Sequence, residues 1–215
     1  MKIRNPAHEL YSQRASFYEW LFIDLLGWGK ELETFFRNSH YVHPTDKILD
    51  AGCGTGIVTR VLYQLAHESR HDSVTFHAFD LTWSMLAIFQ RWIDRQGAKQ
   101  IELRQADVLV DTVPLHWSNY DLIVSSTMLE YLPKHEVREA LTNLRQLLKA
   151  GGTLLVMITK RNIITEWLAE KWWKTNTYTA DEIQTVFDDA GFDQITFKPF
   201  SPRWSNYILV VEAKK

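Results

Sequence analysis

The chain has 215 residues, of which 46 % are hydrophobic and 23 % are charged. This length favours one α/β domain with a core large enough to exclude water. The formal net charge of −2 and the lack of a long basic run argue against binding to nucleic acid by phosphate neutralisation. A single cysteine, Cys53, excludes an internal disulfide and fits a reducing compartment.

The sequence predicts neither a secretion signal nor a membrane-spanning helix. Charged and polar residues interrupt the first 20 positions, where a signal peptide would need an apolar run. The longest apolar stretch, Trp20 to Trp28, contains Asp24 and is too short to cross a bilayer. We therefore expect a cytoplasmic protein.

In chain order, apolar periodicity predicts leading helices followed by strands and helices in alternation. The predicted helices are Leu10–Leu26, Lys30–Asn38, Ile57–Ala66, Trp83–Arg95, His135–Leu148 and Ala180–Ala190. The predicted strands are Lys47–Asp50, Val74–Asp80, Ile101–Gln105, Tyr120–Ser125, Thr153–Ile158, Gln194–Lys198 and Asn206–Glu212. This alternation predicts a doubly wound α/β fold with a mostly parallel seven-stranded sheet, helices on both faces and an antiparallel C-terminal edge hairpin.

The loop after the first predicted strand is rich in glycine. Ile48 to Gly56 spell Ile-Leu-Asp-Ala-Gly-Cys-Gly-Thr-Gly, and Gly52, Gly54 and Gly56 leave the backbone open to a ligand. A dinucleotide fingerprint would need a glycine at position 57, and a P-loop would need Gly-Lys-Ser/Thr; neither is present. Asp50 would repel a pyrophosphate and attract an ammonium or a sulfonium group.

Three motifs in register resemble those of the class I S-adenosylmethionine-dependent methyltransferases. The glycine loop resembles motif I, and the run from Asp80 to Leu86, Asp-Leu-Thr-Trp-Ser-Met-Leu, resembles the second motif. Gln105-Ala-Asp-Val108 resembles the third. The resemblance covers roughly residues 45–160 and is closest to the branch that acts on small molecules and on lipid or quinone precursors. It implies S-adenosylmethionine as the cofactor.

The resemblance also implies roles for residues of the cofactor site. Asp50 and the glycine loop would hold the methionine end, and Asp80 would accept hydrogen bonds from the ribose hydroxyls. The remaining implied cofactor residues are Tyr11 and Tyr18 in a lid, Leu81, Met85, Asp107 and Val108 around the adenine, and Ser125 after the fourth strand. Plainer roles stay open: a capping acid at position 50 or 80, a solvated acid at 107, and core packing for the two tyrosines.

The acceptor side has fewer matches to the family. Where the small-molecule branch often carries a histidine, this chain has Glu130 and Tyr131, so these two and Tyr18 are the candidate catalytic residues. Glu130 could take a proton, orient a cationic acceptor or cap the next helix. The segment lacks the Pro-Pro-aromatic pattern of enzymes that methylate exocyclic amines, which argues against DNA-adenine and glutamine methylation.

Nine tryptophans are an unusual number for this length. Several cluster after the fifth predicted strand, where the family places acceptor-binding insertions. The predicted acceptor pocket comprises Met128, Tyr131, Arg161, Trp167 and Trp172. Two uses stay open beside simple core packing: an amphiphilic acceptor held near a membrane surface, or an amine held by cation–π contacts. We expect no metal site, because the eight histidines show no close ligand spacing.

The sequence thus predicts a single methyltransferase domain over residues 1–215, acting on a small-molecule or lipid-related acceptor. Residues 1–45 would form a helical lid, 46–160 the cofactor-binding core, and 161–215 an acceptor-side insertion with the C-terminal hairpin. Two alternatives remain beside it: a non-catalytic cofactor-binding module that acts through a protein partner, and an RNA or protein methyltransferase. A nucleotide-dependent oxidoreductase is disfavoured by Ile57 and Asp50.

Overall fold

The computed structural model describes residues 27–110, 113–114, 116–169, 171 and 174–215. It divides the chain into two compact units, with the division between Asp107 and Val108. The predicted helix Leu10–Leu26 lies outside the described residues.

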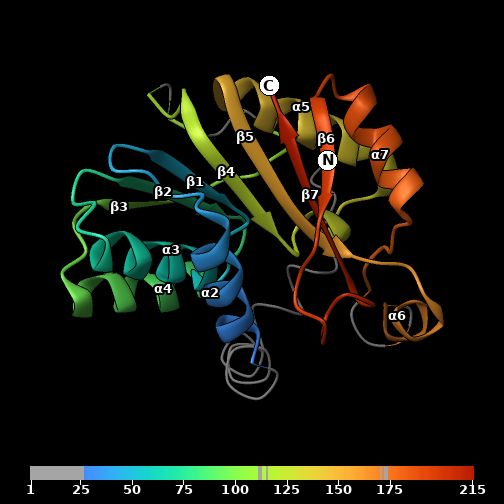
Figure 1. The fold of residues 1–215 in the computed structure, drawn as a ribbon, viewed down its shortest axis with the longest axis horizontal. Helices are drawn as coiled ribbons and strands as arrows, with labels where there is room; N and C mark the ends of the chain where they lie inside the picture. Colours follow the sequence, from blue (N-terminus) through green and yellow to red (C-terminus); the bar gives the residue numbers. More distant parts are fainter. Residues whose placement is uncertain (1–26, 111–112, 115, 170, 172–173) are drawn as a thin grey trace. The chain divides into compact units, whose positions relative to one another are not determined.

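The first unit contains a parallel sheet in which β2 lies between β1 and β3 (Figure 1). The strands are β1 (Lys47–Ala51), β2 (Thr75–Asp80) and β3 (Ile101–Gln105), and the helices are α2 (Trp28–Ser39), α3 (Ile57–Glu68) and α4 (Trp83–Gln96). Parallel strands need crossover connections, which α3 and α4 provide. All three strands begin and end within one residue of their predicted limits.

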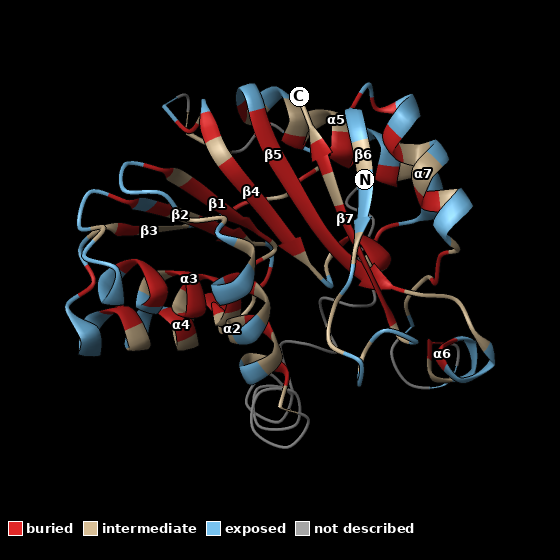
Figure 2. Ribbon diagram, viewed as in Figure 1, coloured by how far each residue is buried: buried red, intermediate tan, exposed pale blue. Residues whose placement is uncertain are grey.

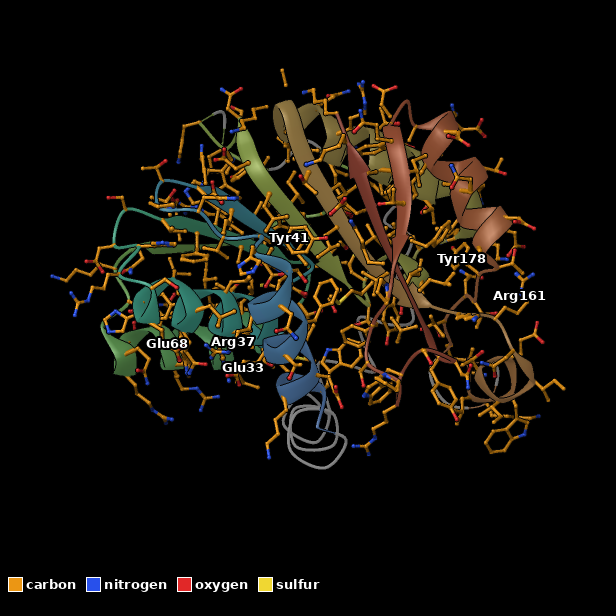
Figure 3. The ribbon with its side chains drawn as sticks, viewed as in Figure 1. Glu33, Arg37, Tyr41, Glu68, Arg161 and Tyr178 are labelled. Carbon is orange, nitrogen blue, oxygen red and sulfur yellow. The ribbon has the colours of Figure 1, made fainter. Side chains whose placement is uncertain are left out.

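Helix α2 packs on α3, while α4 packs on β2 and β3. At the surface, Nη1 of Arg37 lies 2.8 Å from Oε2 of Glu68 on α3, and Nη2 lies 2.8 Å from Oε1 of Glu33 on α2 (Figure 3). These side chains are about half exposed, so the ion pairs add little to the buried packing of Leu32 and Phe36.

The second unit contains four strands in the order β4-β5-β7-β6. They are β4 (Tyr120–Ser126), β5 (Leu148–Thr159), β6 (Asp193–Lys198) and β7 (Ile208–Lys214). The helices are η2 (Leu129–Tyr131), η3 (Lys134–Glu136), α5 (Val137–Leu147), α6 (Ile163–Leu168) and α7 (Ala180–Asp189). Strand β4 runs parallel to β5, whereas β7 is antiparallel to both β5 and β6. The predicted α/β class, with seven mostly parallel strands and an antiparallel C-terminal pair, is confirmed.

Burial follows the strands closely (Figure 2). Residues 154–158 of β5 are all fully buried, as expected for a strand covered on both faces. The edge strand β6 is mostly exposed or half-buried, and Phe197 there is 40 % exposed. No helix in the described part of the chain is long and apolar enough to cross a membrane.

Strand β5 begins at Leu148, five residues before the predicted start at Thr153. Tyr120 pairs with Leu148 and Leu122 pairs with Thr153, so residues 149–152 bulge out of the ladder. A Cβ atom at Gly152 would lie 2.7 Å from the carbonyl oxygen of Tyr120. Glycine is therefore required where the bulge returns to the sheet.

The substitution Gly56→Ala is expected to destabilise the first unit strongly. Gly56 has φ +85°, and an added Cβ would lie 2.4 Å from the ring of Phe89 on α4. We expect a loss of roughly 2–4 kcal/mol in the free energy of unfolding, from left-handed strain and from overpacking. The matched control is Gly97→Ala, which has φ +63° but no neighbour within 4 Å. It should cost only about 1 kcal/mol. Equal losses in urea denaturation would contradict the packing argument.

Candidate functional site

The glycine loop between β1 and α3 is fixed to the end of β2. The backbone N–H groups of Gly52 and Cys53 both donate to the carbonyl oxygen of Phe79 at 2.9 Å. The N–H of Gly56 donates to the carbonyl oxygen of Cys53 at 2.8 Å and closes the turn before α3. Gly52, Gly54 and Gly56 all have φ between +53° and +85°, a region that favours glycine.

Asp80 holds the middle of this loop. Its Oδ2 accepts a hydrogen bond from the N–H of Gly54 at 2.9 Å, and its Oδ1 accepts one from the N–H of Thr82 at 2.7 Å. One half-buried carboxylate thus joins the glycine loop to the start of α4. A carboxylate oxygen can accept more than one hydrogen bond, so Asp80 retains capacity for a ligand. The sequence predicted a ligand-binding acid here but not its bond to the loop.

Two glycines of the loop serve different purposes. A Cβ at Gly54 would meet no heavy atom within 4 Å, so open space adjoins the backbone at that position. Gly56, by contrast, lies against the ring of Phe89 and is needed for packing. Gly54 thus has open space on its Cβ side and the Asp80 carboxylate at its N–H group, and this arrangement fits a ligand that carries hydroxyl groups.

Asp50 is buried and faces α3. It is 2 % exposed, and its Oδ2 accepts hydrogen bonds from the N–H of Thr59 at 3.1 Å and from Oγ1 of Thr59 at 2.7 Å. Burial raises the pKa of this carboxyl to about 7, although the bonds from Thr59 lower it. Asp50 therefore ties β1 to the first turn of α3, in line with the capping role that the sequence analysis left open. Its contact with the methionine end of a cofactor stays a prediction.

The end of β3 lies beside the residues that follow β2. The N–H of Ala106 donates to the carbonyl oxygen of Asp80 at 3.2 Å, and Nε2 of Gln105 donates to that of Leu81 at 2.9 Å. These bonds bring the second and third motifs together within the first unit. Of the predicted adenine contacts here, Leu81 is 38 % exposed, Asp107 is half-buried and Met85 is buried.

The remaining predicted cofactor residues lie elsewhere. Val108 and Ser125 belong to the second unit, and both are buried. The Oγ of Ser125 has no hydrogen-bond partner among the described residues. Tyr11 and Tyr18 lie outside the described residues, as does Trp172 of the predicted acceptor pocket.

Glu130, in the second unit, is a buried carboxyl with one unsatisfied oxygen. Its Oε1 accepts a hydrogen bond from Oγ1 of Thr159 at 2.9 Å, whereas Oε2 has no partner among the described residues. Glu130 is 2 % exposed, and burial raises its pKa to about 7 against the opposing effect of hydrogen bonding. The side chain makes no helix-capping bond. Proton transfer and cation binding remain as its candidate roles.

A pocket of about 360 Å³ lies in the same unit. Arg161 lines it, together with Lys134, Glu166, Ala169 and Thr175–Thr177. Nη2 of Arg161 donates to the carbonyl oxygen of Thr177 at 2.8 Å and to Oε1 of Glu182 at 2.9 Å, so its charge is largely balanced (Arg161 is labelled in Figure 3). The predicted acceptor residues Met128, Tyr131 and Trp167 do not line this pocket, and Trp167 is 54 % exposed.

Residues 48–152 match the family model of a methyltransferase domain. A malonyl-[acyl-carrier protein] O-methyltransferase of Paenibacillus sp. (strain JDR-2) is 36 % identical over 120 residues, which are 55 % of this chain and 41 % of that protein. The highly reducing polyketide synthase acrA of Aspergillus aculeatus is 27 % identical over 168 residues, covering 70 % of this chain and 7 % of the synthase. The chain thus spans about two fifths or less of the length of these relatives.

Among solved structures, the magnesium protoporphyrin IX methyltransferase of Synechocystis PCC 6803 with bound S-adenosylhomocysteine superposes with a TM-score of 0.64. The match covers 87 % of this chain and 81 % of that one at 17 % identity, which shows a shared fold. Residues 48–152, about half of the chain, thus match a methyltransferase domain, and this match with the glycine loop supports the class I S-adenosylmethionine-dependent type that the sequence predicts. S-adenosylmethionine is the cofactor of that class.

The substitution Glu130→Gln is expected to change how stability depends on pH. A carboxyl whose pKa is raised in the folded state stabilises the protein below its unfolded pKa and loses that contribution as the pH rises to about 7. Glutamine mimics the protonated form at every pH. Between about pH 5 and pH 8 the variant should therefore lose less stability than the wild type, by roughly 2 kcal/mol in urea denaturation.

The matched control for this measurement is Glu166→Gln, because Glu166 has a side chain that is 56 % exposed. It should keep the pH dependence of the wild type. If Glu130→Gln and the wild type showed parallel stability curves, Glu130 would not be a buried titrating group.

Proposed function

We propose that this chain transfers the methyl group of S-adenosylmethionine to a small-molecule or lipid-related acceptor. The observation that carries the proposal is the geometry at Asp80. Its carboxylate holds the N–H of Gly54 at 2.9 Å beside open space, in a chain with the matching methyltransferase domain. A site with a charged hydrogen-bond acceptor and bare backbone fits a cofactor that has a ribose diol and no phosphate.

The resemblance to the family supplies the binding roles of the residues, and the geometry at Asp80 supports one of them. Asp80 would accept hydrogen bonds from both ribose hydroxyls. The loop backbone would lie against the methionine end of the cofactor, while Asp50 would hold β1 against α3 beneath the loop. Leu81, which is partly exposed, would cover one face of the adenine, and Asp107 would accept from its amino group.

When bound, the cofactor supplies a methyl carbon activated by its sulfonium. The protein then needs only to align the nucleophile, exclude water and, for some acceptors, remove a proton. Glu130 suits the last task, because its pKa of about 7 lies near the optimum for a general base at neutral pH, and its Oε2 accepts no hydrogen bond from the described residues. We therefore favour an acceptor whose reacting atom loses a proton, such as a hydroxyl or a carbon next to a carbonyl.

The names of the relatives support a small-molecule acyl acceptor. One is named for methylating the malonyl group of an acyl-carrier protein, and another is a polyketide synthase. The first name describes an acyl group on a carrier protein, and the second describes polyketide synthesis. A carrier-bound or free acyl compound is therefore the first class of acceptor to screen, with release of S-adenosylhomocysteine as the readout. Cofactor binding without turnover on any acceptor would favour a non-catalytic module.

The substitution Asp80→Ala should weaken binding of S-adenosylhomocysteine by about 10- to 100-fold in calorimetry, because a charged acceptor for two hydroxyls is lost. Asp94→Ala is the control, since Asp94 is exposed near the end of α4, where its Oδ1 accepts a hydrogen bond from Nε2 of Gln90 at 2.9 Å. The wild type should bind S-adenosylmethionine and S-adenosylhomocysteine but not NAD.

Asp80→Ala also removes the bond to Gly54, so the ribose contact needs a separate test. A cofactor analogue without ribose hydroxyls should bind the wild type weakly, and Asp80→Ala should add little to that loss. Fully additive losses would mean that Asp80 acts only on the loop, and the ribose assignment would fail.

The substitution Glu130→Gln should lower kcat by about 10²- to 10⁴-fold on an acceptor that must lose a proton, with unchanged affinity for S-adenosylhomocysteine. The wild-type rate should rise with pH through about 7 as Glu130 ionises. Thr159→Val removes the hydrogen bond to Oε1 and should move that rise to higher pH. A pH profile unchanged in both variants would exclude Glu130 as the base.

A further inference from the structure

Helix α6 presents an apolar surface to solvent. Ile163 is 88 % exposed, and Ile164 and Trp167 are each 54 % exposed. With 3.6 residues per turn, these three positions fall on one side of the helix, while Thr165 on the other side is buried. We call Ile163, Ile164 and Trp167 the α6 face. Exposed apolar groups that cluster in this way mark sites of interaction.

The α6 face is held in place by a well-formed cap. Oδ1 of Asn162 accepts hydrogen bonds from the N–H groups of Ile164 at 2.9 Å and Thr165 at 3.0 Å, and Oγ1 of Thr165 accepts one from the N–H of Asn162 at 2.9 Å. Oγ1 of Thr165 also donates to the carbonyl oxygen of Lys160 at 2.6 Å. These bonds fix the start of the helix, so its apolar side chains are displayed by a defined backbone.

Cationic residues adjoin the α6 face. Lys171 and Lys174 are exposed just after the helix, and Lys160 lies just before it. Nδ2 of Asn162 donates to the carbonyl oxygen of Asn206 at 2.6 Å, which ties the helix start to the loop that carries the exposed Arg203. The acidic Glu166 lies near Arg161, with Oε1 3.5 Å from Nε. Residues 160–174 carry four basic and two acidic side chains, Glu166 and Glu170, and so are net positive in a chain whose net charge is −2.

We propose that the α6 face docks on an anionic membrane surface, with Ile163, Ile164 and Trp167 inserted among the lipids and the flanking cations at the headgroups. Tryptophan favours this interface, and basic side chains near it add affinity for anionic lipid. A stable protein–protein interface buries about 800 Å² on each partner. Three side chains on a six-residue helix offer too little for that, but they suffice as a shallow membrane anchor.

The opposite side of the same segment lines the pocket through Glu166 and Ala169. A membrane bound at the α6 face would therefore lie next to this polar pocket. The docking surface does not depend on the proposed methyl transfer, since it rests on exposure and charge alone. Failure of one proposal leaves the other intact.

Cosedimentation of the full chain with vesicles tests the proposal. We expect binding to vesicles of phosphatidylcholine mixed with phosphatidylserine at low ionic strength, weaker binding as salt is raised, and little binding to phosphatidylcholine alone. Ile163→Asp and Trp167→Ser should each lower the apparent affinity for the anionic vesicles at least about tenfold, and Lys171→Glu should do the same. All three positions are exposed, so the fold should be kept.

The matched control is Trp83→Ser, which removes a tryptophan that is 67 % exposed on α4. It should bind vesicles like the wild type. Lack of binding to anionic vesicles, or equal binding by the α6 variants and the wild type, would overturn the proposal. It would also be overturned if Ile163→Asp changed only the oligomeric state in sedimentation velocity, because the face would then contact a second copy of the chain.

Discussion

The hydrogen bonds of Asp80 are the constraint on which the cofactor half of the protein depends. One carboxylate accepts from the N–H of Gly54 and from the N–H of Thr82, and so connects the loop after β1 with the start of α4. Both donors are backbone N–H groups that lie just before a helix, where no carbonyl group of the helix can accept their hydrogen bonds. The same negative charge that orders the loop is thus available to a ligand that lies against it.

The glycines of the loop after β1 meet two different demands. Gly56 lies against the ring of Phe89, so its lack of a side chain serves packing between α3 and α4. Gly54 has only open space beside it, so its lack of a side chain leaves the backbone open to a ligand. Both have positive φ, so a substitution at either position strains the backbone, but only one at Gly56 also disturbs packing.

Much of the fold could be predicted because buried parallel strands are short apolar runs between turns. The limits of β1, β2 and β3 were predicted to within one residue, whereas β5 begins earlier because of the bulge at residues 149–152. Helix α6 was not predicted, because its six residues are too few for the spacing of apolar residues to indicate a helix. The partnership of Asp50 with Thr59 was also missed, because composition and motif spacing do not specify which side chains meet.

Asp50 and Glu130 have nearly the same raised pKa, yet their surroundings favour different functions. Oδ2 of Asp50 receives two hydrogen bonds from Thr59, so its carboxyl is committed to holding β1 against α3. Oε2 of Glu130 receives none from the described residues, although burial alone would favour a satisfied or apolar group there. An unsatisfied buried oxygen costs stability unless a ligand or a proton completes it. At Glu130 no helix-capping bond offsets this loss of stability. This is the physical reason to look for the acceptor beside Glu130 rather than beside Asp50.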